Sequence, residues 1–158
     1  MSGLERPRTP HLRVGAIAAI ATLVLDQASK LWLLYVFDLA HRDAVRVTPF
    51  FDLVLALNVG ISFGWFQTDN QLAQVALMAI KAIAVIVLGI WMARSSTLVA
   101  TLALGLIIGG AIGNAIDRLH WPGVMDFALF HASFGGVRYN WYVFNLADTA
   151  IEIGRAHV

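Results

Sequence analysis

The sequence predicts an integral membrane protein made mainly of α-helices, with four transmembrane helices and a small β-rich platform outside the membrane. Two observations lead to this prediction. Of the 158 residues, 59% are hydrophobic and only 13% are charged, with a mean hydropathy of +0.73, whereas soluble domains contain about 25% charged residues. In addition, three apolar runs approach or exceed the roughly 20 residues that a helix needs to cross a bilayer.

The apolar runs give the order of the predicted helices. The three long runs cover residues 14–37, 72–93 and 98–116. A fourth run begins near Trp141 and is short, so we expect four spanning helices of which the fourth is truncated. Gly109, Gly110 and Gly113 near the end of the third run would let two helices pack closely.

The segment between the first two helices, residues 38–71, predicts the platform. It is rich in β-branched and aromatic residues and is interrupted by Pro49, Gly60 and Gly64. This pattern favours short strands over a membrane span. We therefore expect a small sheet that lies on the membrane surface.

Basic residues predict the orientation. Those that precede the first run, or lie in the short loop after the second, are Arg6, Arg8, Arg13 and Arg94. Such residues mark the cytoplasmic side of a membrane protein. We expect a cytoplasmic N-terminus, with the segments 38–71 and 117–141 outside. Apolar residues resume after Lys30 and no small-residue cleavage site follows, so the first run predicts an uncleaved anchor.

Charge and cysteine counts exclude several classes of function. The net charge of +1 leaves no basic surface for nucleic acid. Zero cysteines exclude a disulfide framework, a thiolate metal site and a cysteine nucleophile. His120 and His131 flank Asp126, but two histidines are too few for a catalytic zinc site. We therefore expect no metal and no cofactor.

Ionisable residues at membrane depth are costly and mark candidate sites. Asn114, Asp117 and Arg118 lie at positions i, i+3 and i+4 and so share one helical face. The simplest interpretation is an ion pair between Asp117 and Arg118 that closes the helix end. In the first run, Asp26 and Lys30 are spaced i, i+4 and predict an ion pair within the helix.

Two aspartates lack a cation nearby in the sequence. Asp126 lies in VMDF, and Asp148 lies three residues after Asn145 in FNLAD. Two carboxyl groups brought together share a proton, so that one acts as a base and the other as an acid, as in aspartic proteases. The residues alone leave open a small proton-coupled transporter, with a relay through Asp26, Lys81 and Asp148. They also leave open a membrane scaffold without catalysis.

Five short motifs in order resemble a known family. They are DQASK from Asp26, NVGISFG from Asn58, GNAIDR from Gly113, VMDF from Val124 and FNLAD from Phe144. Together with the hydropathy of four spans, this set resembles the bacterial lipoprotein signal peptidases, also called signal peptidase II. That family consists of four-helix aspartyl peptidases of the bacterial cytoplasmic membrane. The resemblance covers residues 14 to about 151.

The resemblance implies an endopeptidase that removes the signal peptide from diacylglyceryl-modified prolipoproteins and cuts before the lipidated cysteine. Asp126 and Asp148 would form the catalytic dyad, with Asp117 as the main rival. Residues that would orient the dyad and the substrate are Asn58, Asn114, Arg118 and Asn145. Residues that would support the fold near the site are Asp26, Lys30, Gly60, Gly113 and Asp117. The expected partners are prolipoproteins and membrane lipid, and a monomer is expected.

The end of the chain departs from the family pattern, in which the fourth helix continues well past FNLAD. Only ten residues follow Asp148, and the last seven, EIGRAHV, match the translation of a common sequencing adapter. We expect one integral membrane peptidase domain over residues 1–151. We expect residues 152–158 to be an artefact, with a natural chain that continues beyond about Ile151.

Overall fold

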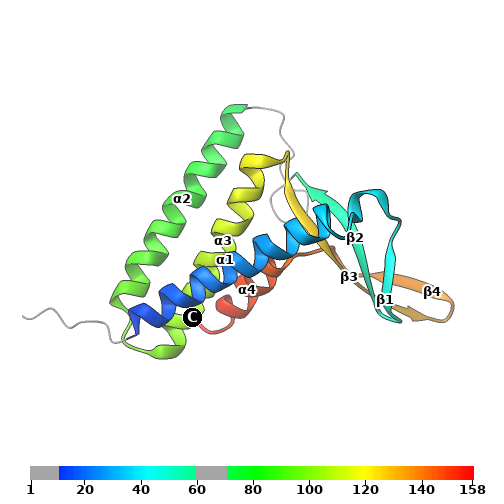
Figure 1. The fold of residues 1–158 in the computed structure, drawn as a ribbon. Coiled ribbons are helices and arrows are strands. Elements are labelled where there is room, and N and C mark those ends of the chain that lie inside the picture. The colour runs from blue at the N-terminus through cyan, green and yellow to red at the C-terminus, as the bar shows by residue number, and fades with distance from the viewer. Residues whose placement is uncertain (1–10, 60–70) are drawn as a thin grey trace, which may run out of the picture.

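The computed structural model describes residues 11–59 and 71–158, with side chains in the second range from residue 78 onward. The helices are α1 (Leu12–Tyr35), α2 (Gln71–Arg94), α3 (Leu98–His120) and α4 (Leu146–Arg155), with a short 3₁₀ helix η1 (Leu39–His41) after α1. The strands are β1 (Val45–Thr48), β2 (Phe51–Asn58), β3 (Val124–Phe134) and β4 (Val137–Asn140). The sheet projects from one end of the helices (Figure 1).

The long helices lie where the apolar runs predict them. Within the described residues, α1 and α3 are the two helices that are long and apolar enough to cross a membrane. Helix α4 has ten residues and is about 15 Å long, half the roughly 30 Å thickness of the hydrocarbon core. Four spans therefore remain a prediction. Helix α3 continues to His120, beyond the predicted end at Ile116, and so includes Asp117 and Arg118.

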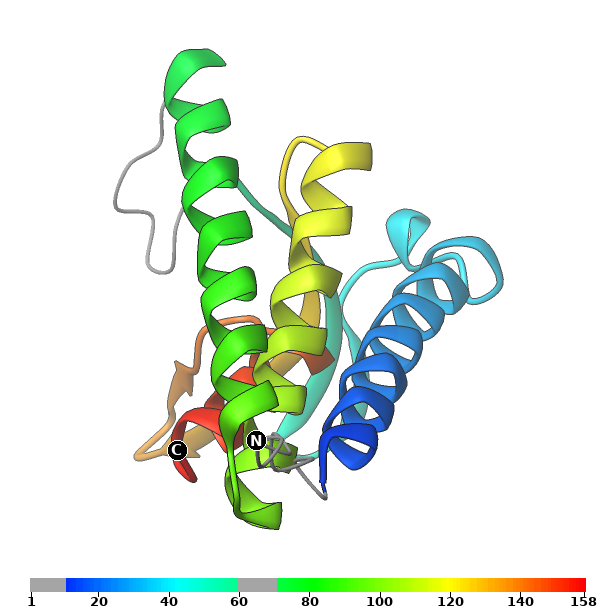
Figure 2. The same ribbon diagram turned by 90° about the vertical axis from the view of Figure 1, so that its left-hand side faces the viewer.

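Glycines allow α3 to pack closely against its neighbours. A Cβ atom on Gly105 or Gly109 would overlap the backbone oxygens of Gly15 and Ala19 in α1. A Cβ atom on Gly110 would lie 2.6 Å from a backbone oxygen at the start of α4. Helix α3 contacts α1, α2 and α4 (Figure 2). The close contacts at Gly109 and Gly110 agree with the packing that these glycines predict.

The sheet comes from two parts of the chain, which corrects the prediction of a platform between the first two helices alone. Its antiparallel order is β1-β2-β3-β4, and β3 and β4 come from the segment between α3 and α4. Gly135 and Gly136 join these strands with φ of +58° and +80°, the backbone of a tight hairpin turn. The bends predicted at Gly60 and Gly64, and the basic residues Arg6 and Arg8, lie outside the described residues.

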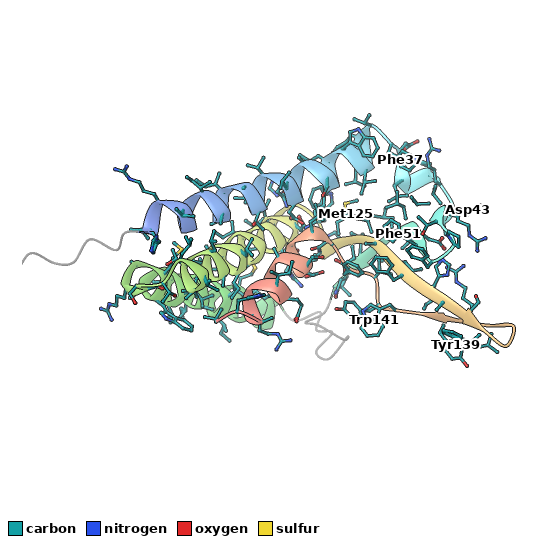
Figure 3. The ribbon with its side chains drawn as sticks, turned by 90° about the horizontal axis from the view of Figure 1, so that it is seen from below. Phe37, Asp43, Phe51, Met125, Tyr139 and Trp141 are labelled. Atoms are coloured by element: carbon teal, nitrogen blue, oxygen red, sulfur yellow. The ribbon has the colours of Figure 1, made fainter. Side chains whose placement is uncertain are left out.

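A buried apolar cluster joins the sheet to the end of α1. Its members are Leu33, Leu39, Met125, Phe127 and Ala128. Met125 lies where the sheet meets the helices (Figure 3). This cluster fixes the start of β3, and Asp126 lies between two of its residues.

Candidate active site

The first turn of α4 brings Asn145 and Asp148 together. The Asn145 side-chain oxygen accepts a hydrogen bond from the backbone N–H of Asp148 at 2.9 Å. In return, Asp148 Oδ2 accepts one from the backbone N–H of Asn145 at 3.2 Å. Such a capping box satisfies two N–H groups that a helix start would otherwise leave unpaired. The FNLAD motif therefore begins α4 and places Asp148 in its first turn.

The amide of Asn145 also joins α4 to β3. The Asn145 Nδ2 atom donates a hydrogen bond to Asp126 Oδ1 at 2.7 Å. The same nitrogen also donates to Asn114 Oδ1 in α3 at 3.1 Å. Asn58, at the end of β2, donates from Nδ2 to Asp126 Oδ2 at 3.2 Å. The Asp126 residue is only 2% exposed. Its carboxylate thus accepts hydrogen bonds from two elements that are far apart in the sequence.

Asn114 connects Asp148 to the interior of the helices. It donates from Nδ2 to Asp148 Oδ1 at 2.8 Å. Its own side-chain oxygen accepts from Lys30 Nζ at 3.2 Å. Arg118 donates from Nη1 to the Asn114 backbone oxygen at 3.2 Å. The residues expected to orient the two aspartates therefore lie in one hydrogen-bonded network with them.

Burial raises the pKa of the Asp126 carboxyl to about 6, with a further contribution from the negative charge of Asp148. The amides of Asn58 and Asn145 act in the opposite direction, because they stabilise the ionised form. The negative charge of Asp148 is thus close enough to influence the ionisation of Asp126. A carboxyl with a pKa in this range can exchange a proton near neutral pH, as general acid–base catalysis needs.

A buried ion cluster lies beneath the two aspartates. Lys30 Nζ is 2.7 Å from both Asp26 Oδ2 and Asp117 Oδ2, and all three side chains are 0% exposed. The predicted ion pair between Asp26 and Lys30 is confirmed. The predicted ion pair between Asp117 and Arg118 is wrong, because the Asp117 carboxylate pairs with Lys30 of α1 while Arg118 donates to the Asn114 backbone oxygen. Asp117 points to α1 and takes Lys30 as its partner.

The buried ion cluster also bonds to the backbone next to each of the two candidate catalytic aspartates. Asp26 Oδ1 accepts a hydrogen bond from the backbone N–H of Ala147 in α4 at 3.0 Å. Asp117 Oδ2 accepts one from the backbone N–H of Met125 in β3 at 3.1 Å. The residues after Ala147 and Met125 are Asp148 and Asp126. The cluster therefore positions the backbone beside each candidate catalytic group.

Two further residues complete the buried ion cluster. Gln27 donates a hydrogen bond from Nε2 to Asp117 Oδ1 at 2.9 Å. The sequence analysis did not single out this residue, although it lies in the DQASK motif. A Cβ atom on Gly113 would lie 2.6 Å from Asp26 Oδ2. The position of Gly113 thus leaves room only for a residue without a side chain.

Asp148 opens into an aromatic groove of about 560 Å³ between α4 and the β3–β4 hairpin. The aromatic residues that line it are Phe50, Phe130, Tyr139, Trp141, Tyr142 and Phe144. Tyr139 lies along the hairpin and Trp141 between the hairpin and α4 (Figure 3). The sequence analysis missed this groove, although the run of aromatic residues before FNLAD was its visible signal.

The remaining sequence candidates lie elsewhere. His120 contacts the backbone oxygen of Ile116, and His131 lies beside Asp52 in the sheet. Across residues 11–59 and 78–158, no three histidine or acidic side chains are grouped so as to hold a metal ion. Gly60 lies outside the described residues.

Comparisons with known proteins agree on one family. The family model described as signal peptidase (SPase) II matches residues 18–158. A lipoprotein signal peptidase of Nitrobacter hamburgensis is 66% identical over 143 residues, which is 90% of this chain and 87% of the relative. A protein of the same name from Rhodopseudomonas palustris is 61% identical over 145 residues, with 92% and 88% of the two chains covered.

Two solved structures share the fold. Both are described as bacterial membrane enzymes, and each has a TM-score of 0.74 and 24% identity to this chain. One alignment covers 96% of this chain and 94% of the solved chain, and the other covers 94% and 87%. Since the family model covers nearly the whole chain and close relatives match over most of their length, the chain belongs to the signal peptidase II family.

Proposed function

We propose that this chain is an aspartic endopeptidase that removes the signal peptide from diacylglyceryl-modified prolipoproteins and cuts before the lipidated cysteine. Its family and the shared name of its relatives support the cleavage of lipoprotein signal peptides and argue against the proton-coupled transporter. The aspartic mechanism rests on one observation: Asn145 hydrogen-bonds to both Asp126 and Asp148.

In this mechanism the two aspartates share one proton. The ionised carboxylate accepts a proton from a water molecule as that water attacks the scissile carbonyl. The protonated carboxyl donates its proton to the carbonyl oxygen, which gives a gem-diol. The C–N bond then breaks, the aspartate that took the proton from water passes it to the leaving amine, and a hydroxyl of the gem-diol returns one proton to the other aspartate. Asp117 is less suited to this work, because its oxygens already accept from Lys30, Gln27 and the Met125 N–H.

The arrangement of the helices supports a site at the external face of the bacterial inner membrane. The ends of α1 and α3, the start of α4 and the sheet all lie at one end of the molecule (Figure 1). Arg13 and Arg94 lie at the other ends of α1 and α2, as the preference of basic residues for the cytoplasm requires. Four spans and a monomer complete the proposal, since one chain supplies both aspartates.

The function is tested by cleavage in detergent of a diacylglyceryl-modified prolipoprotein, followed as a gel shift. The unchanged chain should cut this substrate and leave the unmodified prolipoprotein intact. Asp126→Asn should abolish cutting, because the pair loses its base and its shared proton. Asp43→Asn, on the platform away from the site, is the control and should cut normally. Normal cutting by Asp126→Asn would rule out the proposed dyad.

The orientation is tested by cysteine labelling, since the chain has no cysteine of its own. A cysteine at Ser133, near the end of β3, should react with an impermeant maleimide added outside intact spheroplasts. A cysteine at Ser96, between α2 and α3, should react only after the membrane is opened. The reverse pattern would contradict the proposed orientation.

A further inference from the structure

A second ion cluster lies in the sheet, apart from the two aspartates of the site. Arg138 of β4 donates from Nη2 to Asp52 Oδ2 of β2 at 2.6 Å. The strand order places β3 between these two strands, so the Arg138 side chain reaches across β3. From β3 itself, His131 places Nε2 3.2 Å from Asp52 Oδ1. We call these three residues the sheet cluster.

Arg138 is the principal partner of Asp52. The contact with His131 has the distance of an ion pair but not the geometry of a hydrogen bond. Neither Asp52 Oδ1 nor a ring nitrogen of His131 has a hydrogen-bond partner within the described part of the chain. The hydrogen bond from Arg138 lowers the pKa of the Asp52 carboxyl. Asp52 therefore stays ionised near neutral pH, and its side chain is only 4% exposed.

Strand β4 has little else to hold it in place. All residues of Val137–Asn140 are exposed, and within the described part of the chain the strand pairs with β3 alone. An isolated two-stranded ribbon is only marginally stable in water. Among the described residues, the bond from Arg138 to Asp52 is the side-chain link between β4 and β2. This link thus ties the hairpin to the rest of the sheet.

The hairpin forms one wall of the aromatic groove. Tyr139 and Asn140 directly follow Arg138 and line the groove, which Asp148 also lines. Along β3, His131 lies five residues from Asp126, or about 16 Å at 3.3 Å per residue. The sheet cluster is thus too far from the two aspartates to touch the reacting atoms.

We propose that Asp52 and Arg138 are positioning residues that hold the β3–β4 hairpin as a wall of the substrate groove and so set the affinity for substrate. This inference rests on the proposed function, because it takes the substrate as the occupant of the groove. A wall that is ordered before binding reduces the entropy lost on binding. Releasing the hairpin raises KM, while the chemical step at the two aspartates keeps its rate.

The test measures kcat and KM for a diacylglyceryl-modified prolipopeptide with the full chain in detergent. Arg138→Gln and Asp52→Asn should each raise KM about fivefold or more and keep kcat within about twofold. The double variant should match the single variants, because both remove the same ion pair. Arg138→Lys should recover most of the affinity, since it keeps the positive charge.

Arg46→Gln is the matched control. Arg46 is exposed and lies opposite Asp52 in register from β1, but among the described residues the ion-pair partners of Asp52 are Arg138 and His131. Loss of Arg46 should therefore leave KM unchanged. An unchanged KM in Arg138→Gln and Asp52→Asn, with normal cleavage by the unchanged chain, would overturn this inference and leave the proposed function intact. A fall in kcat at constant KM would overturn it too. No cleavage by the unchanged chain would overturn both.

Discussion

Asn145 places its side-chain amide 2.7 Å from the carboxylate of Asp126, although the two residues belong to different elements. The same side chain caps α4 and so sets the position of Asp148. One asparagine therefore fixes the start of a helix and joins the two candidate catalytic groups. Its two tasks use different atoms, the oxygen for the cap and the amide nitrogen for Asp126, so they can be separated by substitution.

Asn145→Ser should separate these tasks. Serine caps a helix about as well as asparagine, so the thermal unfolding temperature in detergent should change little. The amide donor to Asp126 is lost, so kcat should fall at least about tenfold, the cost of about 1.4 kcal/mol of transition-state stabilisation. Asn145→Ala should lose the cap as well and be less stable by about 1 kcal/mol.

The control for Asn145 is the cap of α3. Thr97 accepts a hydrogen bond from the Ala100 N–H at the other end of the molecule. Thr97→Ala should lower the unfolding temperature and leave kcat unchanged. If Asn145→Ser keeps its full kcat, the amide link to Asp126 has no part in catalysis.

The pH profile should show the raised pKa of Asp126. A dyad that shares one proton loses activity when the second carboxyl ionises, so kcat/KM should fall as pH rises through about 6. Asn58 stabilises the ionised form of Asp126. Asn58→Ala should therefore raise the pKa and move the alkaline limb to higher pH. Ser133→Ala, an exposed change near the end of β3, should leave the profile in place; a shift to lower pH in Asn58→Ala would contradict the assignment.

Local patterns in the sequence were enough to predict where the long helices lie and some of the contacts within the candidate site. Apolar runs determine where α1 and α3 lie, because lipid and the helix core both select apolar side chains. Spacings of three and four residues put Asp26 beside Lys30, and Asn145 beside Asp148. Each of these contacts forms within one or two turns of a single helix, so the spacing alone determines it.

Contacts between distant segments could not be predicted in the same way. The pairing of β2 with β3 joins residues that are more than 60 positions apart, and no local pattern specifies that partner. The ion pair between Lys30 and Asp117 depends on how α1 packs against α3. The hairpin itself has a local signal in the sequence, the Gly135–Gly136 pair between two runs with strand character.

Lys30→Met should destabilise the fold strongly. It would leave Asp26 and Asp117 buried without a cation, and loss of one partner of a buried ion pair costs about 3–5 kcal/mol. Thermal unfolding in detergent should show a large fall for this variant. Adding Asp26→Asn and Asp117→Asn to Lys30→Met should recover part of the loss, because none of these three positions then carries a buried charge.

Arg155→Met is the control for Lys30→Met, because it breaks an exposed ion pair with Glu152. Exposed pairs contribute little, so this variant should unfold at nearly the same temperature as the unchanged chain. Similar losses for the buried and the exposed pair would mean that the buried ion cluster has no special role in stability.

Gly113→Ala should damage the site through a single methyl group. Its Cβ atom would lie 2.6 Å from Asp26 Oδ2, so Asp26 must move away from Lys30 or from the Ala147 N–H. Forcing an extra carbon into a packed interior costs about 1–3 kcal/mol. Because Asp26 holds the start of α4, cleavage activity should fall together with the unfolding temperature in detergent.

Gly89→Ala makes the same chemical change in α2 at a position where no atom of the described residues lies within 4 Å of the added Cβ atom. There alanine only improves helix propensity, by up to about 1 kcal/mol, so stability should hold or rise and activity should stay normal. Both substitutions remove a glycine from a helix interior. A difference between them therefore measures the space around Asp26 and not the backbone preference of glycine, and equal effects would show that the contact with Asp26 is not what requires glycine at position 113.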